Sequence, residues 1–328
     1  GHVGCEHIES PVTPEDIRLE NILTVPPLVE PTGVMGFLLR STLEQTLAAE
    51  HGATAVFCGD GGDSGFCGES FAYSVSEYLR RHGLRREAFR LVSRVALLTE
   101  QSTWSVMYRA LRRWKRGSGM EQLHRTLVMA SHLLSPDLRE SFEAQARYPH
   151  PWFNDQERIP WATIRRLGTL LAAPQFYNVA AGVAPPEVIA PLYAQPVLEL
   201  LLRIPVYCHF EGGRERGLAR RAFAQDLPPE ITRRSWKDRA PGIYDELIHY
   251  NRGFLREVLL DGVLVREGLL DAAAIEEALS DRVVKNPVLP GEVFRHLDVE
   301  VWARNWMPRA ADGSSKGLAE PEINEASL

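Results

Sequence analysis

Apolar residues recur along most of the chain at the three- and four-residue steps that are typical of helices. The pattern is clearest over residues 35–47, and Gly52 then stands where a glycine commonly ends a helix. In residues 13–23, Thr13 can cap a helix whose first position is Pro14. Further helices are predicted over residues 69–83, 85–116 (one or two), 123–134, 159–173, 196–204, 216–224, 243–260, 271–279 and 294–306.

One short apolar run, Ala53–Cys58, departs from this helical pattern. Its length and composition predict a strand that is covered on both faces, as in a parallel sheet. A turn with four glycines and two aspartates, Gly59–Gly65, follows the run directly. The order of helix, strand, glycine turn and helix predicts the core of a parallel α/β unit, with the turn at the carboxyl end of the strand.

The glycine turn is the most informative stretch for chemistry. Its glycines let a ligand approach the backbone closely, which suits phosphate. Asp60 and Asp63 would repel a bare phosphate, but a Mg²⁺ ion that bridges carboxylate and phosphate removes this conflict. Two other interpretations stay open: an aspartate that takes a proton during catalysis, and a surface turn whose aspartates are simply solvated.

The overall composition is that of a globular protein. Apolar residues make up 45% and charged residues 24%, and 37 basic against 43 acidic residues give a net charge of −6. An acidic chain is a poor candidate for general nucleic-acid binding. Its four scattered cysteines favour a reduced, cytoplasmic setting. The most apolar run, residues 197–206, is too short to span a bilayer and contains Arg203. We therefore expect neither a nucleic-acid nor a membrane partner.

A basic segment stands out against this acidic background. Residues 214–239 contain eight positive and four negative side chains, a local balance of +4. Such a concentration of positive charge suits an anionic ligand such as a polyphosphate. The alternative is a pair of helices with solvated charges.

Three stretches of the chain resemble motifs of the synthetase domain of the asparagine synthetase family. The glycine turn, Gly59–Gly68, resembles the family's Gly-Glu-Gly-Ser-Asp-Glu-x-Phe-Gly-Gly. Glu187–Ala194 is similar to Glu-x-Arg-x-Pro-Phe-Leu-Asp. The arginine-rich helix that begins at Arg216, followed by Leu227-Pro228 and by Arg234–Lys237, is similar to the family's fourth motif. The order and spacing of the three stretches agree, and the resemblance covers roughly residues 5–307.

This resemblance implies a fold and a domain organisation. The fold class is α/β, with a partial adenine-nucleotide (PP-loop ATPase-like) parallel sheet and a large, mainly helical remainder. Residues 1–310 are expected to form one synthetase domain, and residues 311–328 a disordered tail. The family's first motif, Ser-Gly-Gly-x-Asp-Ser, which cradles the ATP phosphates, is missing from the sequence together with its strand.

The resemblance also implies chemistry. Members of the family activate a carboxylate with ATP as an acyl-adenylate, release pyrophosphate and form an amide, so ATP and Mg²⁺ are the expected cofactors. Asp63 would bind Mg²⁺–pyrophosphate. Asp60 and Glu187 would position or deprotonate the attacking amine, and Lys237 would stabilise the developing charge. The residues expected to hold the nucleotide are Gly59, Gly61, Gly62, Asp63, Ser64 and Arg234.

Within the family, the chain resembles the lasso-peptide macrolactam synthetases. The resemblance lies in the Asp-Gly-Gly-Asp form of the turn and in residues 102–104, 150–152 and 191–197. It implies a ribosomal peptide as substrate, ring closure between its N-terminal amine and an Asp or Glu side chain, and a leader peptidase or leader-binding protein as a partner.

The departures from the family motifs leave two alternatives open. Ser64, Ile189 and Ala194 replace a glutamate, an arginine and an aspartate of the family, which weakens the case for free aspartate or ammonia as substrates. One alternative is a synthetase that acts on another small, amino-acid-like carboxylate. The other is a non-catalytic, synthetase-like subunit that binds a peptide or a partner, which the missing first motif would favour.

Overall fold

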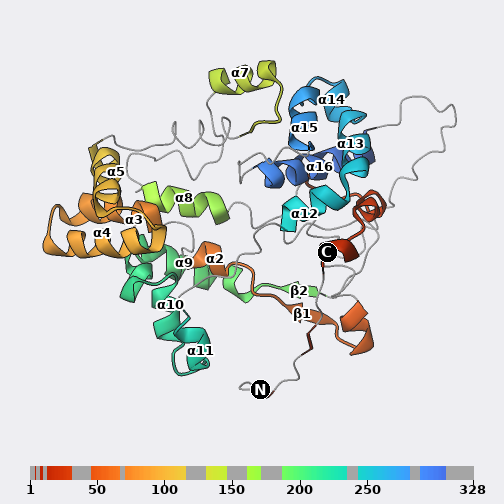
Figure 1. Ribbon diagram of the computed structural model, residues 1–328. Helices are drawn as coiled ribbons and strands as arrows, with labels where there is room; N and C mark the ends of the chain where they lie inside the picture. Colours follow the sequence, from red (N-terminus) through yellow and green to blue (C-terminus); the bar gives the residue numbers. More distant parts are fainter. Residues whose placement is uncertain are drawn as a thin grey trace, which may run out of the picture.

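The computed structural model describes residue 4 and residues 8–9, 13–31, 46–66, 71–115, 131–145, 161–170, 187–234, 243–280 and 289–307. Over these ranges the chain is mostly helical and contains a small parallel sheet (Figure 1). Most of the predicted helices over residues 35–47 and 123–134, and the predicted tail over 311–328, lie outside the described residues. Residues 131–134, the described end of the second of these helices, are not helical.

The sheet joins two segments that are far apart in the sequence. Strand β1 (Ala55–Phe57) pairs in parallel with β2 (Glu187–Ile189), and Ala55, Val56 and Phe57 lie opposite Glu187, Val188 and Ile189. This two-stranded pair is the sheet found in the described part of the chain. A parallel sheet is therefore present, whereas the larger PP-loop type of sheet stays a prediction.

The first helical group contains three helices that lie next to one another in the sequence. These are α3 (Phe71–His82), α4 (Arg86–Thr99) and α5 (Thr103–Lys115). Apolar residues at helical spacing on α4 pack against α3 and α5, and the buried members of this core are Val75, Leu79, Ala88, Leu91, Val92, Val95, Ala96, Val106 and Ala110. Gly83 takes the left-handed conformation that ends α3.

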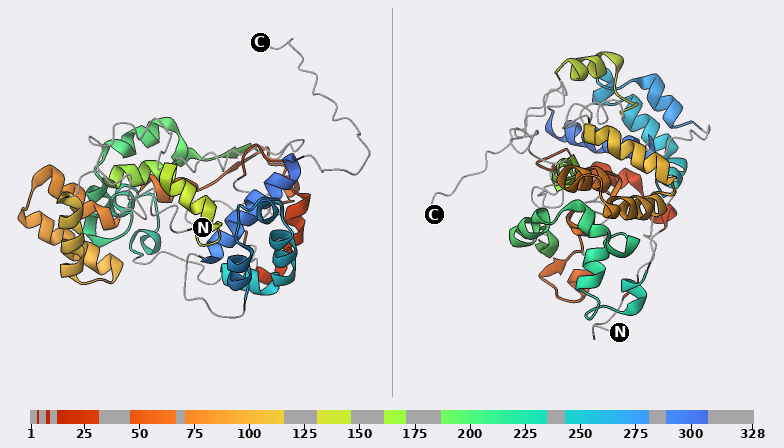
Figure 2. Two further views of the ribbon diagram at one scale, coloured as in Figure 1. Left: turned by 90° about the horizontal axis from the view of Figure 1, so that it is seen from above. Right: turned by 90° about the vertical axis from the view of Figure 1, so that its left-hand side faces the viewer.

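The second helical group combines the N-terminal and C-terminal parts of the chain. Its elements are η1 (Pro14–Asp16), η2 (Leu19–Thr24), α12 (Ile243–Tyr250), α13 (Arg252–Leu260), α14 (Val263–Arg266), α15 (Ala272–Ala278) and α16 (Leu289–Trp306). Leu19 and Ile22 of η2 are buried in the same hydrophobic core as residues of α13 and α16, so the two parts share one core. In Figure 1 and in the left view of Figure 2 this group and the α3–α5 group lie at opposite ends of the molecule.

The remaining elements are short. They are α2 (Gly62–Gly65), α7 (Pro136–Gln145), α8 (Trp161–Leu170), η5 (Pro191–Tyr193), α9 (Gln195–Arg203), η6 (Val206–Gly213), α10 (Gly217–Ala222) and α11 (Pro229–Thr232). A small third core forms where Ala162 of α8 meets Val206 and Phe210 of η6. Through η6 this middle region also packs against α3 and α4.

The structure confirms most of the predicted helices and corrects some details. The stretch 85–116 forms two helices, and the predicted helix over 243–260 is divided at Asn251. Residues 13–23 form two 3₁₀ segments instead of one helix, although Thr13 does act as a cap: its amide and hydroxyl both donate to the carboxylate of Asp16, at 2.9 and 2.7 Å.

The expectation that the first strand is covered on both faces is wrong for β1. Phe57 is 73% exposed, and Ala55 and Val56 are only half-buried. The three-residue pairing with β2 supplies the backbone hydrogen bonds of the strand without burying its side chains. Among the described residues, no helix has the length and apolar character needed to cross a membrane.

Candidate functional site

The glycine turn reverses the chain directly after β1. Gly61 adopts the left-handed backbone conformation, with φ 90°, and caps the single helical turn α2. The amide of Gly65 donates to the carbonyl of Gly61 at 2.7 Å, and the amide of Phe66 donates to that of Gly62 at 3.1 Å. The residues predicted to hold a nucleotide, from Gly59 to Ser64, therefore form one compact backbone turn.

Gly61 also makes the closest approach between the turn and the segment after β2. A Cβ atom at Gly61 would lie 3.1 Å from the carbonyl carbon of Leu192, in η5, and 3.2 Å from its Cβ. A Cβ at Gly59 would meet nothing within 4 Å. Gly61 thus seats the turn against η5, while the backbone at Gly59 stays accessible to a ligand.

The strand pairing places Glu187 next to the strand that carries the turn. The amide of Cys58 donates to the carbonyl of Ile189, and the amide of Glu187 donates to that of Thr54, both at 2.9 Å. Glu187 is exposed and lies opposite Ala55, at the amino end of the pair. Asp60 follows the carboxyl end of β1, so the two predicted acid–base residues lie on adjacent segments but toward opposite ends of the strand pair. Their joint action on an amine stays a prediction.

Asp63 connects the turn to the basic segment. Its carboxylate forms an ion pair with the guanidinium of Arg216, and both side chains are partly exposed. Arg216 has a φ of 55° and caps the N-terminus of α10. A non-glycine residue in this region of backbone space is uncommon and is often found at functional sites. The ion pair brings together two sequence motifs that are 153 residues apart.

Three further arginines gather beside this ion pair. Burial is the main cause that lowers the pKa of Arg220 below its ordinary value, and the charges of Arg216, Arg214 and Arg234 lower it further. We call Arg214, Arg216, Arg220 and Arg234 the arginine cluster. Backbone carbonyls hold two of its members in place: Arg220 donates to Glu215, at 3.0 Å, and to Ile231, and Arg214 donates to Thr232 at 3.3 Å. This crowding of like charges favours the binding of a multiply charged anion.

The remaining predicted site residues divide into two groups. Ser64 lies within α2, half-buried, and Arg234 belongs to the arginine cluster. Lys237 lies outside the described residues, so its predicted role stays a prediction.

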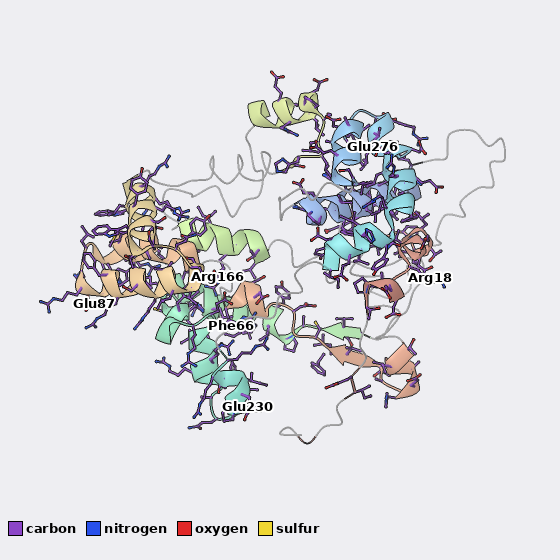
Figure 3. The ribbon with its side chains drawn as sticks, in the orientation of Figure 1. Arg18, Phe66, Glu87, Arg166, Glu230 and Glu276 are labelled. Carbon is purple, nitrogen blue, oxygen red and sulfur yellow. The ribbon has the colours of Figure 1, made fainter. Side chains whose placement is uncertain are left out.

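A buried arginine that the sequence analysis did not identify hydrogen-bonds to the end of the turn. Arg166 of α8 donates to the carbonyl of Gly65 at 2.6 Å and to that of Leu201, in α9, at 2.7 Å. Figure 3 shows Arg166 beside α2, near Phe66. One of two adjacent arginines in a predicted helix gives no sequence signal of such a role, because most arginines are solvated. Arg216 and Arg220, by contrast, could have been chosen from the basic segment.

The carboxylates and arginines at this site fit a metal-bound diphosphate better than they fit a metal ion held by protein side chains alone. Within the described ranges, no group of three or more His, Cys, Asp or Glu side chains could enclose an ion. Mg²⁺ commonly takes one or two carboxylates, with phosphate and water oxygens completing its shell. Asp60 and Asp63 supply such carboxylates in one turn, and the arginine cluster beside Asp63 supplies charge for the phosphates.

The family model for asparagine synthase matches residues 1–304. No curated protein and no solved structure matches the chain.

Proposed function

The chain belongs to the asparagine synthase family, and from this premise we propose that it is a Mg²⁺-dependent synthetase that closes a macrolactam ring in a ribosomal peptide of the lasso type. The family match supports an ATP-dependent, amide-forming ligase. The assignment to ring closure of a lasso-type peptide rests on the Asp-Gly-Gly-Asp turn and on the stretch 191–197. The substrate's N-terminal amine would attack an activated Asp or Glu side chain of the same peptide.

The observation that carries the proposal is the ion pair between Asp63 and Arg216. It joins the acidic turn after β1 to the arginine-rich motif, which are the two parts that a synthetase needs around a metal-bound diphosphate. A cation held at Asp63 would lie beside the arginine cluster, so the phosphates of the same ligand would meet positive charge directly. Neither a solvated surface turn nor a solvated helix pair requires this contact.

We expect the following roles for the chain's own residues. Asp63 would hold Mg²⁺, and Arg216 and Arg234 would hold the phosphates. Bound ATP would supply AMP as the activating group and diphosphate as the leaving group. Lys237 would stabilise the negative charge that develops as the amide forms.

The proton of the attacking amine would be removed by a carboxylate. An ammonium group has no lone pair with which to attack, so a carboxylate must take its proton. Asp60 lies in the turn itself, and Glu187 lies on the neighbouring strand. Asp60 is nearer to the carboxyl end of the strands, where ligands bind in open α/β sheets, so it is the first candidate for this role.

ATP–pyrophosphate exchange in the presence of Mg²⁺ tests the proposal. We expect exchange to depend on a lasso-type core peptide and to be absent with each free amino acid tested alone. Asp63→Asn should lower the exchange rate by about 100-fold or more, because the metal-binding carboxylate is lost. Asp226→Asn, the same chemical change at an exposed position after α10, is the matched control and should leave the rate unchanged.

Each alternative predicts a different result. A synthetase of small substrates would exchange pyrophosphate with a free amino-acid-like carboxylate and not with peptides. A non-catalytic subunit would bind peptide without any exchange. If Asp63→Asn exchanges as fast as the unaltered protein, the assignment of the turn to Mg²⁺–diphosphate is wrong.

A further inference from the structure

The α3–α5 group exposes large apolar side chains at the end of the molecule away from the C-terminal helices. Leu97 of α4 is 79% exposed, and Trp104 and Tyr108 of α5 are 83% and 65% exposed. Trp104 and Tyr108 are four residues apart, so they lie on the same side of their helix, one turn from each other. Exposed aromatic residues gathered on one side of a helix are typical of interaction surfaces.

These side chains are not needed for the group's own packing. The inward side of α5 is already occupied, because Val106 and Ala110 are buried against α3 and α4, with Leu111 and Trp114 beside them. The exposed side of α5 is therefore a second apolar surface on a helix whose core face is complete.

The segment that carries these side chains is strongly basic. Residues 71–115 contain ten lysine and arginine residues against three acidic ones, a balance of +7 in a chain whose net charge is −6. Arg90 and Arg94 of α4 and Arg109 and Arg112 of α5 are all exposed. Figure 3 shows long side chains ending in nitrogen around α4 and α5, in the neighbourhood of Glu87.

We propose that the outer surface of α4 and α5 is a docking site for an acidic polypeptide segment that also carries apolar side chains. Carboxylates of the partner would pair with Arg109 and Arg112, and its apolar side chains would cover Trp104 and Tyr108. Aromatic residues and arginines are the side chains that contribute most to binding at protein interfaces. The proposal does not depend on the ligase chemistry, because none of these residues belongs to the glycine turn or to the arginine cluster.

Charge complementarity favours a polypeptide over the other anionic partners. A helix that lies on a membrane presents a continuous apolar face, whereas on α5 the exposed Arg109 follows Tyr108 directly and Arg112 lies one turn further along. A nucleic acid could pair with the arginines, but it offers no aliphatic side chain to pack on Leu97, which is 79% exposed. An acidic peptide can match the positive and the apolar parts together.

Fluorescence anisotropy with the full chain tests the proposal. The probe is a fluorescein-labelled peptide of three Glu-Leu-Gly-Asp-Phe-Ser repeats, and its neutral counterpart has Gln and Asn in place of Glu and Asp. We expect saturable binding of the acidic probe that weakens as salt is added, and binding of the neutral probe that is about tenfold weaker. The double variant Trp104→Ala/Tyr108→Ala should weaken binding of the acidic probe by about tenfold.

Two further variants test whether binding of the probe depends on this surface specifically. Arg109→Gln/Arg112→Gln should weaken binding by about tenfold and reduce its dependence on salt. Tyr244→Ala, at a partly exposed aromatic on α12, should leave binding unchanged. The proposal is overturned if the acidic probe does not bind, if the α5 variants bind it as well as the unaltered chain, or if oligouridylate or phosphatidylserine vesicles bind this surface more tightly than the probe. The anisotropy experiment contains no ATP, so a negative result in it does not bear on the ATP–pyrophosphate exchange that tests the proposed function.

Discussion

Two constraints act on Gly61 at once. Its φ of 90° lies in the region that side chains disfavour, and a Cβ atom there would press on the backbone of Leu192 at 3.1 Å. A flexible side chain could move away from such a contact, but a backbone carbonyl cannot move without displacing η5. The glycine therefore sets both the reversal of the chain and the distance between the turn and η5.

Gly61→Ala should consequently lower the free energy of unfolding by about 1–3 kcal/mol, since backbone strain and a steric contact add. Gly59→Ala is the matched control: a Cβ there meets nothing within 4 Å, so its effect should be clearly smaller. Urea unfolding of the two variants measures the difference. Equal loss of stability in both would show that the contact with Leu192 does not constrain the turn.

For single residues, the sequence shows which residue types form the site better than it shows which residues contact one another. The crowding of glycine and aspartate after an apolar run marked Asp60 and Asp63 for a ligand. The partner of Asp63 could not be predicted, because Arg216 is one of eight positive side chains in its segment and the contact spans 153 residues. Arg166 gave no signal, since burial, which defines its role, is a property of the packed molecule.

Among the secondary-structure elements, α2, α8 and α9 meet at the guanidinium of Arg166. Its two short hydrogen bonds end on the carbonyls of Gly65 and Leu201, which belong to elements that are far apart in the sequence. The side chain is almost fully buried. Removing it would leave two carbonyls without this donor in a region that water does not reach.

Arg166→Met should therefore lower the free energy of unfolding by about 2–4 kcal/mol, the cost of buried acceptors that lose a charged donor. The same change at Arg203, which forms a surface ion pair with Glu199 on α9, should cost less than about 1 kcal/mol. Hydrogen exchange adds a local measurement: the amide of Gly65 should exchange faster in Arg166→Met. A global loss without faster exchange at Gly65 would contradict a local role in holding α2.

Helices were easier to predict than strands for a physical reason. The helices of the two main groups bury one side, and this leaves a regular apolar spacing that the sequence displays. β2 has three residues, of which Glu187 is exposed, so no alternation could reveal it. β1 was found because it is apolar and precedes glycines, yet the inference that it is covered on both faces failed at the exposed Phe57.

The stability of the whole molecule should fall in mild acid. Burial is the main cause that lowers the pKa of His209 and His296 to about 4 from an ordinary value of 6.5, and nearby arginines contribute. The unfolded chain then binds more protons than the folded chain between pH 6.5 and pH 4, so unfolding becomes easier as the pH falls through this window. Burial raises the pKa of Glu77, which acts in the opposite direction as the pH approaches that pKa.

Between pH 7 and pH 5 each histidine should contribute a loss of about 2 kcal/mol to the free energy of unfolding. His209→Gln and His296→Gln should each flatten this dependence on pH, and replacing the exposed His51 by Gln should not. Urea unfolding midpoints from pH 7 to pH 5 provide the measurement. A slope that persists in both the His209 and the His296 variant would assign the effect to other groups.

At the level of the whole chain, sequence patterns predicted a mixture of helices with a parallel strand but not its layout. The main cores are separate, and one of them joins η2 to helices more than 200 residues later. Such pairing depends on which apolar faces fit one another, and helical spacing alone does not encode it. The family motifs gave the order of the site segments, and the fold shows how two of them meet.

The parallel pairing of β1 with β2 also affects how the protein is made. The strands are separated by roughly 130 residues, and joining such distant segments is slow because a long loop must close. The buried residues of the α3–α5 core all lie within that interval, although Tyr207 of η6 also packs against them. During synthesis the contacts among α3, α4 and α5 can form before Glu187 and η5 are available to the acidic turn. The helices that carry the proposed docking surface would then be in place before the proposed catalytic turn is complete.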